Sequence, residues 1–219
     1  MRMLERRSGA GALGFWAAIC SAFFSIAYVL AQLLEWTGLL GSAGGPNSPS
    51  TALGLAVILT PSLLLGPAFL VMTAALHQMA PESRRAFTQV AVAFATVYAT
   101  LNCFIYFVQL TFVAPRIAQG HTADIQLLLF VPYKSFLFAA DLLGYSFMSA
   151  STLFSAFGLP PTPTTPVAKA ALIANGLLVP ALALQMYFPF LIWVGALWAI
   201  TFPVSAVLLA RVFATSQQP

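Results

Sequence analysis

Polar residues that could do chemistry recur on one face of an apolar segment between residues 133 and 157. They follow one another at steps of seven, four, four and three residues: Lys134, Asp141, Tyr145, Ser149 and Thr152. Because an α-helix turns once in about 3.6 residues, these steps return to the same helical face. A carboxylate inside an apolar helix is costly and by default marks a functional site. Asp141 is therefore the first candidate, and a structural lock between helices is its nearest alternative.

A second polar stripe lies in the preceding apolar segment, residues 86–113. Its members recur at steps of three and four residues: Tyr98, Asn102, Tyr106 and Gln109. Counting the helical rise from the outer end places Asp141 about 12 Å below the outer surface, level with Asn102 and Tyr106. We expect the Asp141 carboxyl to hydrogen-bond with Asn102 or Tyr106.

The outer ends of other apolar segments add polar side chains at a similar depth. The predicted ligand-binding residues are Glu35, Asn102, Tyr106, Gln109, Lys134, Asp141, Tyr145 and Gln185. Together they predict a polar pocket in the outer half of the bundle. An alternative remains for each of them, because intramembrane polar residues also join helices by hydrogen bonds, and Lys134 and Glu35 can reach the interface as structural residues.

The sequence carries no motif for a metal, a cofactor or a covalent nucleophile. His77 and His121 are expected on opposite sides of the membrane, so they cannot share a metal or a haem. Cys20 and Cys103 lie at different depths, too far apart for a disulfide. We therefore expect no cofactor, no metal site and two free thiols.

Composition identifies the elements that must position these residues. The chain has 219 residues, of which 60% are hydrophobic and only 6% are charged, with a mean hydropathy of +0.91. Its apolar runs are long enough to cross a bilayer as helices, at about 20 residues per crossing. We predict an all-α fold, a polytopic membrane helical bundle of six transmembrane helices that forms one domain over residues 1–219. The predicted spans are 14–36, 52–76, 86–113, 133–157, 167–187 and 190–213.

Prolines define several of the expected boundaries. The sequence Tyr187-Phe188-Pro189 divides the last long apolar stretch into two spans, because proline cannot continue helical hydrogen bonding. Pro115 is expected to end the third span and Pro132 to open the fourth, with a short interfacial helix over residues 125–131 between them.

Two further prolines lie at similar places in the two halves of the chain. Pro61 and Pro180 are expected to bend the second and fifth spans. Matched interruptions of this kind occur in transporters built from inverted repeats. The rest of the two halves share little beyond hydrophobicity, so the indication of a repeat is weak.

The basic residues predict the orientation of the chain. Seven of them fall on the side of the N-terminus: Arg2, Arg6, Arg7, Arg84, Arg85, Lys169 and Arg211. The opposite side has Arg116 and, near its edge, Lys134. Because basic loops stay in the cytoplasm, we expect both termini there. We also expect the first span to be retained, and the protein to lie in a bacterial plasma (inner) membrane. The high pI then reflects attraction to anionic membrane lipids, with no nucleic acid as partner.

Three hypotheses for function remain open. The first is a protein that binds or transports a small polar or amphipathic ligand, lipids included, through the pocket in the non-cytoplasmic half. The second is a non-catalytic accessory or scaffold subunit of a larger membrane complex, with other membrane subunits as partners. The third, an intramembrane enzyme that uses Asp141 with Tyr145 or Lys134 as acid and base, has no catalytic motif to support it.

Overall fold

The computed structural model describes the backbone of residues 2–216 and the side chains of residues 9–216. Every regular element in this part of the chain is helical, and it contains no strand. Six helices are long and apolar enough to cross a membrane, and they run over residues 9–36, 52–79, 82–118, 136–157, 165–183 and 189–215. The predicted fold class is confirmed, and the six spans fall where the apolar runs place them.

Several of these spans are composed of more than one helical segment. In chain order the elements are α1 (Arg2–Trp36), α2 (Ala52–Met79), η1 (Glu82–Arg84), α3 (Arg85–Val108), the π-helix η2 (Gln109–Val113), α4 (Ala114–Ala118), η3 (Ala123–Leu128), α5 (Phe136–Phe157), α6 (Thr165–Gly176), α7 (Val179–Ala183), η4 (Pro189–Leu191), α8 (Ile192–Gly195) and α9 (Trp198–Thr215).

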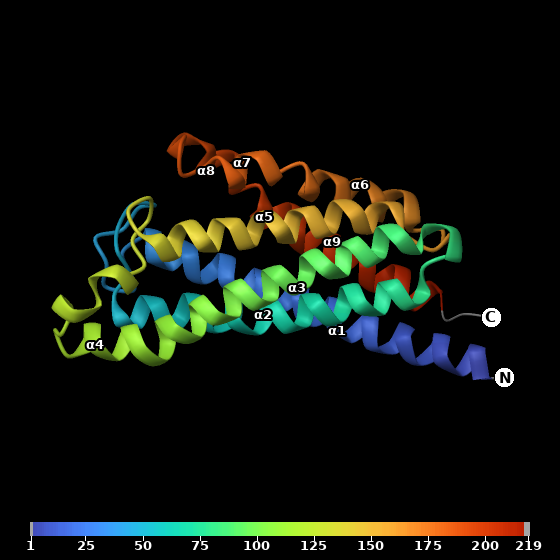
Figure 1. Ribbon diagram of the computed structural model, residues 1–219, viewed down its shortest axis with the longest axis horizontal. Coiled ribbons are helices and arrows are strands. Elements are labelled where there is room, and N and C mark those ends of the chain that lie inside the picture. Colours follow the sequence, from blue (N-terminus) through green and yellow to red (C-terminus); the bar gives the residue numbers. More distant parts are fainter. Residues whose placement is uncertain (1, 217–219) are drawn as a thin grey trace.

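The six spans form a closed ring. Around it α1 packs on α2, α2 on α3, α3 on α5, α5 on α6, α6 on α9, and α9 on α1. Figure 1 shows that α1 begins and α9 ends at the same end of the bundle, as an even number of crossings requires. The opposite end carries loop 37–51, η3 and the turn 184–191, and is called the distal end below.

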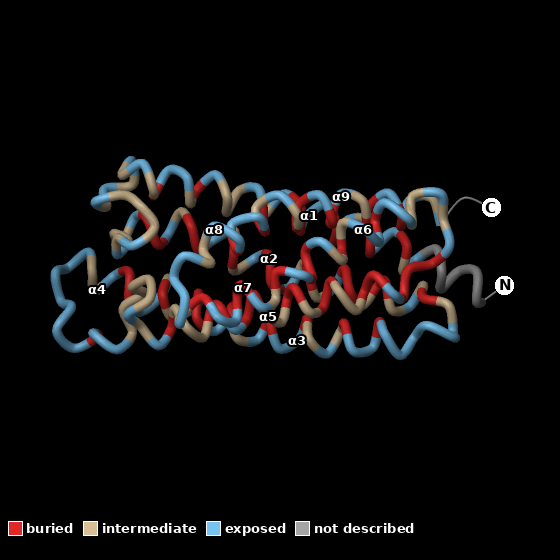
Figure 2. Tube along the Cα trace, turned by 90° about the horizontal axis from the view of Figure 1, so that it is seen from above, coloured by how far each residue is buried: buried red, intermediate tan, exposed pale blue. Residues whose placement is uncertain are grey.

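Buried residues follow the inward faces of the helices, and exposed residues follow the outward faces (Figure 2). The outward residues are largely apolar, among them Leu30, Phe104 and Ile200. Such an apolar outer surface is suited to contact with lipid, because in water it would cause the protein to aggregate.

The third span differs from its predicted end. The helix continues past Val113 through the π-helix η2 and α4, up to Ala118. Pro115 lies in the first turn of α4, where its missing N–H removes no bond of that segment. The Arg116 guanidinium donates to the Phe112 carbonyl at 3.0 Å, which gives that backbone oxygen a partner. Proline therefore does not end this span.

The start of the fourth span also differs from its prediction. Ser135, and not Pro132, begins it, because the Ser135 hydroxyl accepts a hydrogen bond from the Phe138 N–H at 3.1 Å and caps α5. The short helix expected over residues 125–131 is the 3₁₀ helix η3, which begins at Ala123 and ends at Leu128.

The two matched prolines behave differently. Span five is interrupted at Leu177 and Leu178, directly before α7 and Pro180. Span two runs as one α-helix with Pro61 and Pro67 inside it. The interruption expected in both halves is therefore found in one of them, and the two halves of the bundle are not alike in this feature.

An aromatic layer fills the middle of the ring. Trp198 and Phe202 of α9 stack with ring centroids 5.2 Å apart, and Phe202 contacts Phe69 of α2 at 5.6 Å. Tyr145 of α5 contacts Trp198 at 5.1 Å and Tyr98 of α3 at 5.8 Å. Offset and edge contacts of this kind stabilise packed aromatic rings beyond their buried area. The layer joins four of the six spans across the centre of the bundle.

Candidate functional site

The distal half of the bundle encloses a cavity of about 460 Å³. Tyr145 and Trp198, both members of the aromatic layer, belong to its walls, and Gly45, Pro46 and Ser48 of loop 37–51 border it at the distal end. Most of the remaining wall is aliphatic or aromatic, as is usual for small-molecule sites. The polar side chains of the wall are Tyr28, Gln32, Glu35, Ser48, Ser50, Tyr106, Asp141, Tyr145 and Gln185.

Asp141 is held at the cavity by two donors from α3. Asn102 Nδ2 donates to Asp141 Oδ1 at 2.8 Å, and the Tyr106 hydroxyl donates to the same oxygen at 2.6 Å. The predicted contact between the two polar stripes is therefore confirmed. Asp141 Oδ2 makes no hydrogen bond to any described residue, and the side chain is 7% exposed. One carboxylate oxygen is fixed, and the other is available to the cavity.

The close approach of α3 and α5 makes this arrangement possible. A Cβ atom at Gly144 would lie 1.6 Å from Asn102 Oδ1, so only glycine leaves room for the Asn102 amide. About two turns further along α5, the Ser151 hydroxyl donates to the Ala91 carbonyl of α3 at 2.7 Å. The two helices are thus joined by hydrogen bonds on both sides of Gly144.

Glu35 is the second acidic residue of the wall and has no partner. It is 2% exposed, and neither of its carboxylate oxygens accepts a hydrogen bond from the described residues. Its carboxylate packs on the first turn of α2, where a Cβ at Gly54 would lie 2.6 Å from Glu35 Oε2. The positive end of the α2 dipole is close by, but the Gly54 N–H is already bonded to the Thr51 hydroxyl at 3.0 Å.

The two carboxylates lie at different depths. Tyr28 of α1 and Tyr145 of α5 mark a common level, because their rings are 6.3 Å apart. Glu35 is seven residues beyond Tyr28 and Asp141 is four residues before Tyr145, which corresponds to about 10 Å and about 6 Å toward the distal end. Glu35 is therefore about one helical turn nearer the distal loops than Asp141.

Gln185 closes the wall beside the turn that joins the last two spans. Its Nε2 donates to the Tyr133 hydroxyl at 3.3 Å, and Gly195 leaves room for its carbonyl, since a Cβ there would lie 2.9 Å from Oε1. Burial raises the pKa of the Tyr133 hydroxyl, and the hydrogen bond from Gln185 opposes this effect. Tyr133 thus stays protonated at neutral pH and can donate to the Pro189 carbonyl at 3.5 Å.

Five of the eight predicted residues line the cavity: Glu35, Tyr106, Asp141, Tyr145 and Gln185. Asn102 does not line the cavity, and it contacts the wall through hydrogen bonds to Asp141 and to the Tyr106 hydroxyl. Gln109 belongs to the π-helix, and its Nε2 donates to the Leu128 carbonyl of η3. Lys134 precedes the start of α5 and is exposed. Neither Gln109 nor Lys134 lines the cavity.

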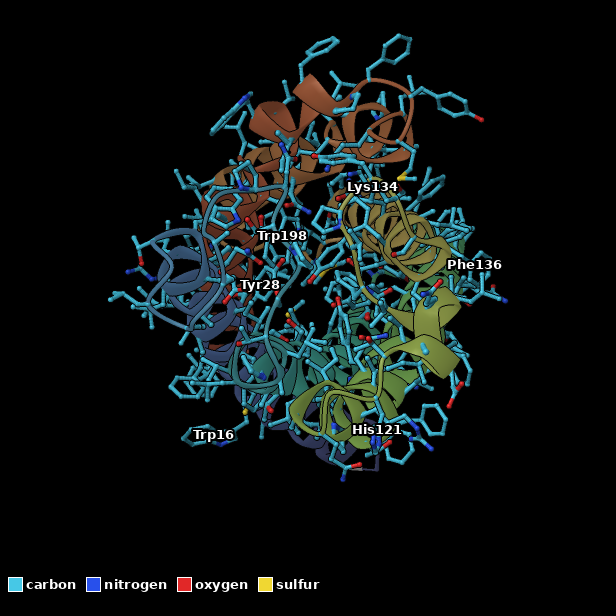
Figure 3. The ribbon with its side chains drawn as sticks, turned by 90° about the vertical axis from the view of Figure 1, so that its left-hand side faces the viewer. Trp16, Tyr28, His121, Lys134, Phe136 and Trp198 are labelled. Atoms are coloured by element: carbon cyan, nitrogen blue, oxygen red, sulfur yellow. The ribbon has the colours of Figure 1, made fainter. Side chains whose placement is uncertain are left out.

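Sequence reasoning missed the aromatic part of the wall. Tyr28 and Trp198 lie beside the centre of the ring, whereas Trp16 and Phe136 lie at its edge (Figure 3). All four residues are aromatics within or next to apolar runs, so composition does not separate them. The signal that could have found Trp198 is its buried indole N–H, which has no partner, but burial is known only once the bundle is assembled.

The chain was compared with protein-family models, with curated proteins and with solved structures. None of them matches it. The site is therefore interpreted from its own geometry.

The wall has a definite chemical character. It holds two carboxylic acids and several aromatic rings, and among the described residues that form it there is no Lys, Arg or His. Within the same part of the chain, no group of three or more His, Cys, Asp or Glu side chains is placed to hold a metal ion. The arrangement can bury an apolar body and offer it acidic acceptors.

Proposed function

We propose that this protein binds a small amphipathic molecule in the distal cavity, as the ligand site of a transporter or receptor. The observation that supports this proposal is the combination of an apolar cavity with one Asp141 oxygen that is left without a partner. Pockets of this size, mostly apolar with a few placed polar groups, are typical of small-molecule sites.

Energetics favour an amphipathic ligand over a purely polar one. Burial of apolar ligand surface against the aliphatic and aromatic wall is favourable in proportion to area. A polar group on the ligand can then bond to Asp141 Oδ2, which has no partner among the described residues. A fully polar molecule would lose its hydration and gain few hydrogen bonds in return.

We also propose that the distal end faces the non-cytoplasmic side of a bacterial plasma membrane, with both termini in the cytoplasm. The distribution of basic residues supports this orientation, because Arg84, Arg85, Lys169 and Arg211 all lie toward the end where the termini are. The cavity would then receive its ligand from outside the cell or from the outer leaflet.

Quenching of Trp198 fluorescence tests the binding proposal. The chain has four tryptophans, and replacement of Trp16, Trp36 and Trp193 with Phe leaves Trp198 as the reporter. Bromo-octanol, brominated at the end of its chain, serves as the probe in nanodiscs. We expect saturable quenching of Trp198, because a bromine that enters the cavity comes into contact with its wall.

A cavity-filling variant provides the matched control. Ala199→Phe places a ring in the cavity wall, whereas Ala214→Phe places the same ring on the exposed face near the other end of α9. Ala199→Phe should weaken the quenching and Ala214→Phe should leave it unchanged. Equal, non-saturable quenching in both variants would mean that the probe only partitions into lipid, and the scaffold hypothesis would replace ours.

A further inference from the structure

We infer that the ligand is an amphipathic organic cation, whose ammonium group pairs with Asp141, near the buried carboxyl of Glu35, while its apolar body lies against the aromatic wall. This inference rests on the proposed function and specifies the chemical class of the ligand. It follows from the charges of the cavity wall, which are acidic only among the described residues.

Asp141 is arranged as an acceptor for a cation. Its Oδ1 already accepts two hydrogen bonds from Asn102 and Tyr106, both of which stabilise a carboxylate. Oδ2 has no hydrogen bond to any described residue and is not fully buried, and Asp141 lines the cavity. An ammonium group has three donors and no acceptor, so it can bond to Oδ2 without competing with the donors at Oδ1.

Glu35 provides the independent observation that a partner is missing. A buried carboxyl without hydrogen bonds is costly in either protonation state, and more so when it is charged. Lys134, just before the distal end of α5, is exposed and does not line the cavity. A cationic ligand would supply the charge that the wall itself does not contain.

The aromatic wall fits the same class of ligand. Tyr28, Tyr145 and Trp198 present rings to the cavity at the level just below Asp141. Aromatic faces attract cations and also pack on an alkyl body. An anionic ligand, such as a fatty acid or a phosphate ester, would instead meet two carboxylic acids and no base.

Three probes that differ only in their head group test the inference. Bromo-octylammonium, bromo-octanol and bromo-octanoate share one brominated alkyl chain and carry a positive, a neutral and a negative head group. In the Trp198 reporter protein we expect the ammonium to bind about tenfold or more tightly than the alcohol. The alcohol cannot form the buried ion pair, and the loss of such a pair costs at least this much affinity. The carboxylate should bind most weakly.

Charge-removing variants assign the preference to the two acids. Asp141→Asn removes the charge but keeps an acceptor oxygen for Asn102 and Tyr106. Glu35→Gln removes the charge of the second acid. Each should weaken the binding of the ammonium and leave that of the alcohol unchanged. Asp124→Asn, on the exposed surface of η3, is the matched control and should change neither.

The outcomes separate this inference from the proposed function. Equal affinities for the three probes, or a preference for the carboxylate, would overturn the cation while keeping the cavity as a binding site. Saturable quenching by none of them would reject the proposed function itself. The ranking of the three probes is measured in the Trp198 reporter with both acids in place. A charge-removing variant that fails to fold therefore leaves this test intact.

Discussion

Asp141 combines two roles that sequence reasoning treats as alternatives. Its Oδ1 joins α3 to α5 through Asn102 and Tyr106, which is the structural role, while its Oδ2 remains available to the cavity. The two oxygens of one carboxylate are used differently. Substitutions that change one property at a time can therefore separate the stability of the bundle from the chemistry of the cavity.

Replacement of Asp141 with Leu should destabilise the protein more than replacement with Asn. Leucine leaves the Asn102 amide and the Tyr106 hydroxyl without their shared acceptor, at a cost of about 1 to 3 kcal/mol. Asparagine retains an acceptor oxygen. Thermal unfolding in detergent, followed by intrinsic fluorescence, should give the lower Tm for Asp141→Leu. Similar Tm values for the two variants would argue against the hydrogen bonds described above.

Gly144→Ala tests the close approach that positions Asn102. The added methyl group would lie 1.6 Å from Asn102 Oδ1, so α3 and α5 must separate or the amide must rotate. We expect a loss of about 1 to 3 kcal/mol in stability, as for other overpacked sites. Gly9→Ala is the control, because nothing lies within 4 Å of the Gly9 position. An unchanged Tm for Gly144→Ala would contradict the packing.

Helical periodicity predicted the contact between the two stripes because it depends only on the phase of regular helices. Asn102, Tyr106 and Asp141 lie in uninterrupted parts of α3 and α5, and the predicted hydrogen bonds are present. Gln109 lies in a π-helix, where the regular phase is lost, and Lys134 lies before the helix begins. Residue types alone do not reveal either departure.

At the scale of elements, apolar run length predicted the spans better than proline predicted their ends. Pro115 lies inside a continuous span and Pro61 inside α2, because bilayer helices tolerate proline when other groups satisfy the backbone. Span five, which was also expected to bend, is interrupted before Pro180. The position of a proline therefore locates a weak point in a span without showing whether the helix breaks there.

A second buried network joins α5, α6 and α9 away from the cavity. Asn175 Nδ2 donates to the Thr152 hydroxyl at 3.0 Å, and Asn175 Oδ1 accepts from the Thr201 hydroxyl at 2.9 Å. None of the three residues lines the cavity. This network has the geometry of interhelical hydrogen bonding, which is the role that intramembrane polar residues commonly have.

Asn175→Leu should reduce stability without changing ligand binding. Two interhelical hydrogen bonds are lost, at about 0.6 kcal/mol each. The Tm should fall modestly, while the affinity of the Trp198 reporter for bromo-octylammonium should stay the same. A loss of affinity at unchanged Tm would mean that the site extends beyond the aromatic layer.

The whole molecule is divided along its long axis. On one side of the aromatic layer the ring is filled by large side chains such as Met72, Leu209 and Phe213. On the distal side the same ring encloses the cavity, bordered by loop 37–51. The closed part holds the six spans together, so the distal part can keep an unfilled volume. This division predicts that ligand reaches the cavity from one side of the membrane only.

Cysteine labelling of intact cells determines which side that is. In a protein without Cys20 and Cys103, single cysteines are placed at Asn47 in the distal loop and at Ser83 in η1, both exposed and at opposite ends of the bundle. The basic residues near Ser83 predict that this end is cytoplasmic. A membrane-impermeant maleimide should therefore label Asn47→Cys in intact cells and Ser83→Cys only after lysis. The reverse pattern would place the cavity on the cytoplasmic side, where its ligand would come from inside the cell.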